Sequence, residues 1–350
     1  MNTKKKIFIH VGAHKTGSSS IQKSLDRYKY FNLRHGVCYI SMTSIFNKFS
    51  FLQEEDLGLI KFTRNYLDSQ INQYKKINNF VISSENIFGD AKNSYSNLQL
   101  MVNSLGKIFR GYDVRIVIYI RRQDLFVESL YTHLVERGYS KNFNSFLTNL
   151  TPDAFEWDKC VNYFEKVFGN GNIIVKNFDE EINLPNGLIA NFSNLIQVPE
   201  MPNVKNNASS NKLIVSIKRC LNSQAKMTNM ENFYLARFLR RQKISNNAKV
   251  FHFNDEDRKK FLRKFDRSNL MIKKKYQIFF PKYQPLFNKE VGFYRCHELK
   301  NMIERFHIFN SKYYYLLFVF YKIKLMFDKY TLKILKFHDL FFKTLSHRRW

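Results

Sequence analysis

Four short apolar runs rich in β-branched residues constrain the fold of this 350-residue chain more than any other feature. They lie at 7–12, 80–84, 115–120 and 172–178. Runs of this length without a polar face are typical of strands buried inside a parallel sheet. Segments with helical spacing separate them, most clearly at 123–137 and 157–168. We therefore predict an α/β fold in which helices cover a parallel sheet.

A loop of small and polar residues links the first of these strands to a helix. Gly12 closes the run 7–12, the loop 13–17 has the sequence AHKTG, and helical spacing runs from Ser18 to about residue 30. Serines at the start of this helix are expected to cap its first turn. Because N–H groups converge at a helix N-terminus and the helix dipole adds partial positive charge, such a junction is suited to binding an anion.

The side chains of this loop have the chemistry of a phosphate-binding site. Lys15 contributes a full positive charge. Hydroxyl donors are contributed by Thr16, Ser18, Ser19 and Ser20. The alternative is that Gly17 only makes a tight turn and Lys15 is solvated. The combination of lysine, glycine and hydroxyls at a strand-to-helix junction favours the binding of an anion.

The loop differs from a Walker A loop in the position of its lysine. Gly12 and Gly17 have the Walker spacing, but Ser18 follows the second glycine where a Walker loop has lysine. No strand ending in an aspartate offers a ligand for Mg²⁺. We therefore predict a site for a phosphate-like group without a metal, and keep a P-loop kinase or related phosphotransferase as the alternative.

A second cationic motif follows the run 115–120. Arg121 comes directly after this strand, at the carboxyl end where open parallel sheets bind their ligands. Arginine is suited to a bidentate contact with phosphate. Ser129 lies eight residues further on, about two turns into the next helix, and is expected to reach the same anion. The alternative is a helix start with solvated charges at Arg121 and Arg122.

Together the two motifs resemble those of the PAPS-dependent sulfotransferases, in particular the bacterial carbohydrate-type members. The KTGSS sequence at 15–19 and the stretch IYIRRQDLFVESLY carry the resemblance, which extends over about residues 5–276. It implies a P-loop NTPase-like parallel sheet flanked by helices, a first loop that holds the 5′-phosphosulfate of PAPS, and a 3′-phosphate held by Arg121 and Ser129. It also implies that Phe178 stacks on the adenine, with burial in the core as the alternative.

The implied activity, transfer of a sulfuryl group to a carbohydrate hydroxyl or amine, sets further roles. Lys15 would stabilise the leaving bridging oxygen, because such transfer relies on positioning and electrostatics. A base must accept the proton of the acceptor. Glu85, which follows the strand 80–84, is the first candidate, with a structural carboxylate near a helix start as the alternative. His14 is the second candidate, although it is expected to shape the loop, and His133 is expected to be structural.

The charge of the chain predicts anionic partners. Lys+Arg number 57 against 29 Asp+Glu, a formal net charge of +28. Part of this excess accompanies an overuse of residues encoded by A- and T-rich codons. We expect an anionic or lipid-linked carbohydrate acceptor, such as a surface polysaccharide or glycolipid. No RNP, helix-turn-helix or zinc-finger signature is present, so nucleic acid is not expected. A non-enzymatic basic protein that binds nucleic acid or an anionic membrane is the other alternative.

The last part of the chain differs in composition from the rest. We expect 1–276 to form the α/β domain and 277–350 to form a helical extension, which is aromatic and carries ten Lys and four Arg against five Asp+Glu. Extra helices packed on the domain are favoured there over a basic element at a membrane surface. Lys322 and Lys324 interrupt its apolar run, so a spanning helix is not expected. The four cysteines lack metal-ligand spacing, so free thiols and a cytoplasmic location, with peripheral contact at the inner face of the membrane, are expected.

Overall fold

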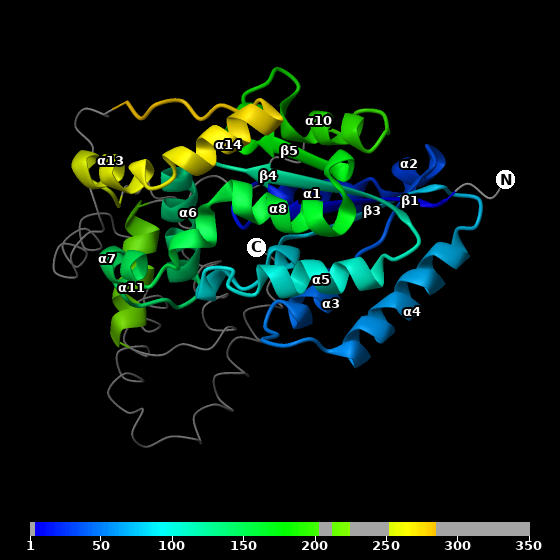
Figure 1. Cartoon of the computed structure of the whole chain (residues 1–350), viewed down its shortest axis with the longest axis horizontal. Coiled ribbons are helices and arrows are strands. Elements are labelled where there is room, and N and C mark those ends of the chain that lie inside the picture. The colour runs from blue at the N-terminus through cyan, green and yellow to red at the C-terminus, as the bar shows by residue number, and fades with distance from the viewer. Residues whose placement is uncertain (1–3, 203–211, 225–251, 285–350) are drawn as a thin grey trace, which may run out of the picture. The chain divides into compact units, whose positions relative to one another are not determined.

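The computed structural model describes residues 4–202, 212–224 and 252–284 (Figure 1). Contacts between residues divide the chain into two units. The first unit contains residues 1–134, 141–210 and 250–292, and the second contains 135–140, 211–249 and 293–350. The sheet and the candidate site belong to the first unit. Of the predicted extension at 277–350, the part from 285 onward lies outside the described residues.

A five-stranded sheet with all strands parallel forms the centre of the first unit. Its strands are β1 (Lys6–Gly12), β2 (Val37–Tyr39), β3 (Asn79–Ser84), β4 (Asp113–Ile120) and β5 (Ile173–Asn177), in the order β2-β3-β1-β4-β5. This confirms the predicted α/β class and the four predicted strands. The additional strand, β2, is only three residues long and lies at the edge of the sheet.

The helices follow the strands in the alternating order that the sequence predicts. They are α1 (Ser18–Arg27), α2 (Lys29–Arg34), α3 (Thr43–Phe49), α4 (Leu57–Gln73), α5 (Leu98–Ile108), α6 (Gln123–Glu136), α7 (Phe143–Thr148), α8 (Trp157–Phe168), α9 (Phe178–Glu181), α10 (Gly187–Leu195), α11 (Lys212–Gln224), α13 (Asp255–Arg263) and α14 (Asp266–Tyr276). The helical segment expected at 18–30 is divided into α1 and α2. Beyond residue 205, the described residues form helices and no strand.

One face of the sheet is covered by α1 and α10. Phe8 of β1 and Val117 of β4 point to this face and pack in one buried cluster with Leu25 of α1 and Phe192 of α10. Alternation along the strands explains the pattern, because every second side chain of β1 points to the same face. His10 also points to this face and lies edge-on to Tyr119 and Phe192.

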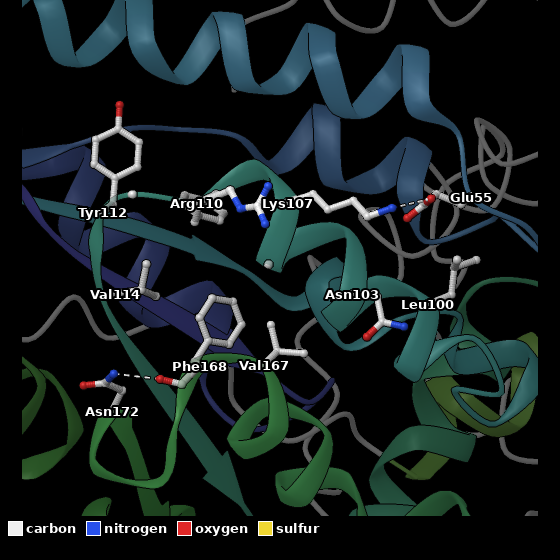
Figure 2. Close-up of a pocket in the computed structure, with 13 residues that line it drawn as sticks. Glu55, Leu100, Asn103, Lys107, Arg110, Tyr112, Val114, Val167, Phe168 and Asn172 are labelled. Carbon is white, nitrogen blue, oxygen red and sulfur yellow. Dashed lines mark hydrogen bonds and ion pairs between the residues drawn. The ribbon is translucent and has the colours of Figure 1, made fainter.

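The other face of the sheet is covered by α5 and α8. Val114 of β4 points to this side and lines a groove with residues of both helices (Figure 2). The two helices approach closely at Gly106, where a Cβ would lie 2.5 Å from Val167 Cγ1. A larger residue at this position would therefore force α5 and α8 apart.

The parallel register places four strand ends along one edge of the sheet. Val11 pairs with Ser84 and with Ile118, and Gly12 pairs with Tyr119, so β1, β3 and β4 end close together. The segments that carry the predicted site residues follow directly on these strands and on β5. In an open parallel sheet this carboxyl edge is where ligands bind.

Two further expectations concern membranes and thiols. Among the residues that the structure describes, no helix has the length and apolar character needed to cross a membrane. Cys38 and Cys160 carry buried free thiols, as expected. Cys220 is disulfide-bonded, so the expectation of a free thiol is wrong for this residue.

Candidate functional site

The loop between β1 and α1 has the backbone geometry of a tight turn. Lys15 has a φ of 68° and Gly17 a φ of 84°, so both lie in the left-handed region. A Cβ on Gly17 would overlap Leu188 and lie 2.9 Å from the ring of Phe178, and a Cβ on Gly12 would overlap the hydroxyl of Ser18. Both positions therefore require glycine, which permits the chain to enter α1 directly above the sheet.

The N-terminus of α1 has no capping side chain. Gly17 occupies the N-cap position and no side chain accepts a hydrogen bond there, so the expected serine cap is wrong. The reason is that Ser18 to Ser20 already lie inside the first turn of the helix. No acidic residue lies in that turn either. The partial positive charge of the helix end is therefore not neutralised locally, which suits an anion.

The hydroxyls of the loop do not all face a ligand. Thr16 is fully buried, and its Oγ1 donates a hydrogen bond to the carbonyl oxygen of Ala13 at 2.6 Å, so it closes the loop. Ser18 is also buried, but its hydroxyl has no partner among the described residues. Ser19 and Ser20 are partly exposed. A buried hydroxyl without a partner is costly, so a ligand oxygen at this loop would relieve the cost at Ser18.

The ends of β4 and β5 meet beside this loop. Phe178 is the first residue of α9 rather than the last residue of a strand, and its ring lies against Gly17. The guanidinium carbon of Arg121, which follows β4, lies 5.4 Å from the centroid of the same ring. The structure thus brings together three residues that the sequence predicts for one nucleotide, from segments far apart in the chain.

Arg121 is held in place by two neighbours. Its Nε donates to both carboxylate oxygens of Asp179, at 2.9 and 3.2 Å. Its carbonyl oxygen accepts a hydrogen bond from the indole of Trp157 at 2.7 Å. Burial raises the pKa of Asp179, and the attraction of Arg121 only partly offsets this effect. Sequence reasoning missed Asp179, although its position next to Phe178 at a strand end is a signal for it.

The rest of the RRQD motif is structural. Asp124 is fully buried and accepts hydrogen bonds from Arg122 Nε at 2.7 Å and from Arg258 at 2.5 Å. Arg258 also donates to Glu128 at 2.8 Å, which ties α13 to α6. Burial disfavours the charged carboxylate of Asp124, but the two arginines outweigh it and lower its pKa. Arg122 and Asp124 therefore support Arg121 rather than face a ligand.

The position of Ser129 does not test the role predicted for it. It lies half-buried on α6, two turns from the beginning of that helix. Among the described residues, the structure records no contact between Ser129 and Arg121. Its predicted role stays a prediction.

The two candidate bases lie around a buried tyrosine that the sequence did not indicate. Tyr95 is 3% exposed, and its hydroxyl lies 3.1 Å from His14 Nδ1. Burial raises the pKa of Tyr95 well above its ordinary value, and the negative charge of nearby Glu85 adds to the increase. Glu85 begins the 3₁₀ helix Glu85–Phe88 directly after β3 and is partly exposed. Tyr95 thus contacts His14 and lies near enough to Glu85 to sense its charge, and we call these three residues the polar cluster.

The backbone that carries Tyr95 is strained. Ser94 and Tyr95 have φ values of 55° and 57°, so two successive non-glycine residues adopt the left-handed region. Each such residue costs of order 1–3 kcal/mol. His133 completes the surroundings, with its ring 6.0 Å from that of His14. Strain of this kind is concentrated at functional sites, because the surrounding structure must hold it in place.

His10 lies beneath the loop and is not a candidate for acid–base chemistry. It is completely buried, and its Nδ1 lies 2.8 Å from the hydroxyl of Ser83. Burial lowers the pKa of His10 to about 3, so its ring is neutral at physiological pH. Its Nε2 has no hydrogen-bond partner among the described residues. We assign it to the support of β1 below Gly12.

The groove in Figure 2 is distinct from this site. It is lined by residues along α5, by the end of α8 and by the beginning of β4, including Arg110, Val114 and Phe168. Lys107 forms an ion pair with Glu55 at its rim, at 2.6 Å. These residues lie at the amino ends of the strands, the opposite edge from the loop residues. Within the described part of the chain, no group of three metal-ligating side chains is arranged to hold an ion.

Comparison with known proteins gives remote relatives. No family model matches the chain. An uncharacterized protein of Archaeoglobus fulgidus is 26% identical over 221 residues, which cover 59% of this chain and 59% of that protein. The chain thus spans about three fifths of the length of this curated relative. The crystal structure of a sulfotransferase from Alicyclobacillus acidocaldarius is similar with a TM-score of 0.38 and 16% identity, over 61% of this chain and 91% of that chain.

Proposed function

We propose that the protein is a sulfotransferase that moves a sulfuryl group from PAPS to a hydroxyl or amine of a carbohydrate. The observation that carries this proposal is the convergence of Gly17, Arg121 and Phe178 at the carboxyl edge of the sheet. The three residues follow three different strands. Their meeting point combines a turn at an uncapped helix N-terminus, a cation and an aromatic ring, which is the chemistry that a nucleotide with two anionic groups requires.

The residues of the site fit such a donor in four ways. The uncapped end of α1, together with Lys15 and the unpartnered hydroxyl of Ser18, would hold the phosphosulfate. Arg121 and Ser129 would hold the 3′-phosphate. Asp179 binds Arg121 through Nε, so this ion pair does not use the two terminal nitrogens of the guanidinium. Phe178 would pack against the adenine.

The chemistry assigned to the chain's own residues is positioning, charge stabilisation and proton transfer. The bond from sulfur to the bridging phosphate oxygen breaks while a bond from sulfur to the acceptor oxygen or nitrogen forms. Lys15 would stabilise the charge on the bridging oxygen that leaves, and the N–H groups of the loop would bind the non-bridging oxygens. The acceptor's proton passes to a base of the polar cluster.

We favour Glu85 over His14 as this base. The hydroxyl of Tyr95 occupies Nδ1 of His14, which fixes the imidazole against the inside of the loop. Glu85 is partly exposed at the end of β3, where an acceptor can approach it. His14 is then a positioning residue that keeps the loop in shape.

We further propose that the acceptor is an anionic or lipid-linked carbohydrate of a surface polysaccharide or glycolipid, and that the enzyme works in the cytoplasm. The net charge of +28 supports an acceptor with negative charge. Peripheral contact with the membrane through 277–350 and the absence of a nucleic-acid partner stay part of this proposal. A transfer assay with labelled PAPS and an extract of the native surface glycans would identify the acceptor.

Calorimetry with PAP in the presence of EDTA tests the donor site directly. The native protein should bind PAP without a metal, and Lys15→Ala and Arg121→Ala should each weaken binding at least about tenfold, as expected for loss of a charge-assisted contact. Arg110→Ala provides the matched control, because this exposed arginine lies at the opposite edge of the sheet. Absence of PAP binding, or equal affinity in all three variants, would remove the proposal.

A further inference from the structure

One face of α14 exposes apolar side chains between cations. Arg267, Leu270, Met271 and Lys274 follow the spacing of residues that share one side of a helix. Leu270 and Met271 are each 49% exposed. The opposite side of the helix is buried through residues such as Ile272. The exposed stripe therefore has no packing role inside the first unit.

The segment after α14 extends this exposed surface. Phe279 is 51% exposed, and the ammonium of Lys273 lies 5.2 Å from the centroid of its ring. We use the name α14 face for the six residues Arg267, Leu270, Met271, Lys273, Lys274 and Phe279. Lys275 is not part of it, because it forms an ion pair with Glu165 at 2.6 Å.

The charge around the α14 face is strongly positive. Between 263 and 282 the chain has seven Lys and Arg residues and a single acidic residue, Asp266. Cations at this density are attracted to the negative surface potential of an anionic lipid layer. Exposed Leu, Met and Phe side chains gain in addition from insertion at the boundary between headgroups and acyl chains. A nucleic-acid backbone would be attracted to the cations but would leave these apolar side chains without a partner.

We propose that the α14 face binds an anionic lipid surface. The feature that points to lipid is the placement of Leu270, Met271 and Phe279 among cations, on a helix and a loop that remain exposed. This proposal does not depend on the activity proposed above, since it concerns only where the protein binds.

Contact at this face would bring the candidate site close to the lipid headgroups. The carbonyl oxygen of Phe279 accepts a hydrogen bond from Asn177, the last residue of β5, at 3.3 Å. The carbonyl oxygen of Pro281 accepts one from Arg122 at 2.9 Å. The segment after α14 is thus fastened to the same strand ends that carry Phe178 and Arg121. A lipid-linked acceptor would meet the enzyme at this edge of the sheet.

Co-sedimentation of the full chain with lipid vesicles tests the proposal. The native protein should bind vesicles of phosphatidylcholine mixed with phosphatidylglycerol and should bind phosphatidylcholine alone much more weakly. The double variant Leu270→Ser/Met271→Ser should bind the mixed vesicles about tenfold more weakly, through the loss of inserted apolar groups. Arg267→Ser/Lys274→Ser should bind at least about tenfold more weakly, through the loss of two cations.

A matched control exists on α4, where Leu57 and Phe62 are 65% and 56% exposed. The variant Leu57→Ser/Phe62→Ser should bind vesicles as the native protein does, and thermal melts should be unchanged in all three variants because the altered residues are exposed. Native binding by both α14 variants would overturn the proposal. An equal loss of vesicle binding in the α4 control variant would also overturn it. Binding of duplex DNA is measured with the same variants, and α14 variants that lose DNA binding but keep vesicle binding would overturn it as well.

Discussion

The guanidinium of Arg121 lies over the ring of Phe178, 5.4 Å from its centroid. This contact joins the end of β4 to the beginning of α9, and the same ring lies against Gly17 of the first loop. The two residues are 57 positions apart in the chain. Substitutions at this contact therefore test the proposed nucleotide site directly.

Phe178→Ala should weaken PAP binding about tenfold or more, because stacking of a base on an aromatic ring contributes about 1–3 kcal/mol. Phe178→Tyr should retain native affinity, since it keeps the aromatic face. Calorimetric titration of both variants measures the effect. Phe62→Ala, at an exposed position on α4, provides the control. Equal affinity of the alanine variant and the native protein would show that Phe178 is only a packing residue.

Gly17→Ala should lower the free energy of unfolding by about 2–4 kcal/mol, because alanine at a positive φ is strained and its Cβ would also overlap Leu188 and Phe178. Denaturant titration measures this change. Gly36→Ala is the matched control: Gly36 has a φ of 78°, but no atom lies within 4 Å of the position of its Cβ. It should lose only about 1–2 kcal/mol from backbone strain. Equal losses at the two positions would contradict the close packing of Gly17 described above.

Glu85→Gln should lower kcat at least about 100-fold while leaving PAP affinity nearly unchanged, because the variant keeps the shape of the side chain but cannot accept the proton. Transfer assays and calorimetry on the same preparation separate the two effects. Glu54→Gln, at an exposed position, is the control and should keep native activity. Native turnover by Glu85→Gln would show that Glu85 is not the base, and His14 would then be the next candidate to test.

The protein should become less stable as the pH is lowered, because His10 is buried in its neutral form. Burial lowers the pKa of this residue to about 3, whereas an unfolded histidine has a pKa of about 6.5. Between these two pKa values the unfolded chain binds a proton that the folded protein does not. The free energy of unfolding therefore decreases by up to about 1.4 kcal/mol per pH unit as the pH falls below 6.5.

Unfolding titrations at several pH values compare the native protein with His10→Phe. The variant lacks this titration, so the difference in stability between the two should shift in favour of the variant as the pH is lowered from 7 to about 4. A constant difference across this range would show that His10 takes up a proton in the folded protein.

The strands could be predicted because each is a continuous apolar run, and the carboxyl-edge site could be predicted because glycine, lysine and arginine follow those runs directly. The strand β2 has three residues, too few for any periodicity. Phe178 continues the apolar run of β5, so the sequence gives no sign that α9 begins there; the side chain of Asn177 accepts a hydrogen bond from the N–H of Asp179 and turns the chain into the helix.

Site residues that depend on contacts between distant segments could not be predicted from the sequence. Arg258 lies 134 positions from Asp124, and nothing in its local pattern distinguishes it from the other basic residues of α13. Tyr95 likewise contacts His14 from a loop without regular spacing. Ser94 and Tyr95 adopt left-handed backbone conformations, and neither is a glycine that would have indicated this. Side chains of this kind are recognised only when the fold places them beside the predicted loop.

The hydrogen bonds that Asn177 and Arg122 donate to the backbone of Phe279 and Pro281 also bear on how the protein can be shortened. A chain that stops at residue 276 would leave both donors without these acceptors, at the two strand ends that flank Phe178 and Arg121. The loss would reach the proposed nucleotide site even though no residue of that site had been deleted. Trimmed versions for crystallisation or fragment screening should therefore end beyond Tyr283, whose hydroxyl binds Asp255 at the beginning of α13.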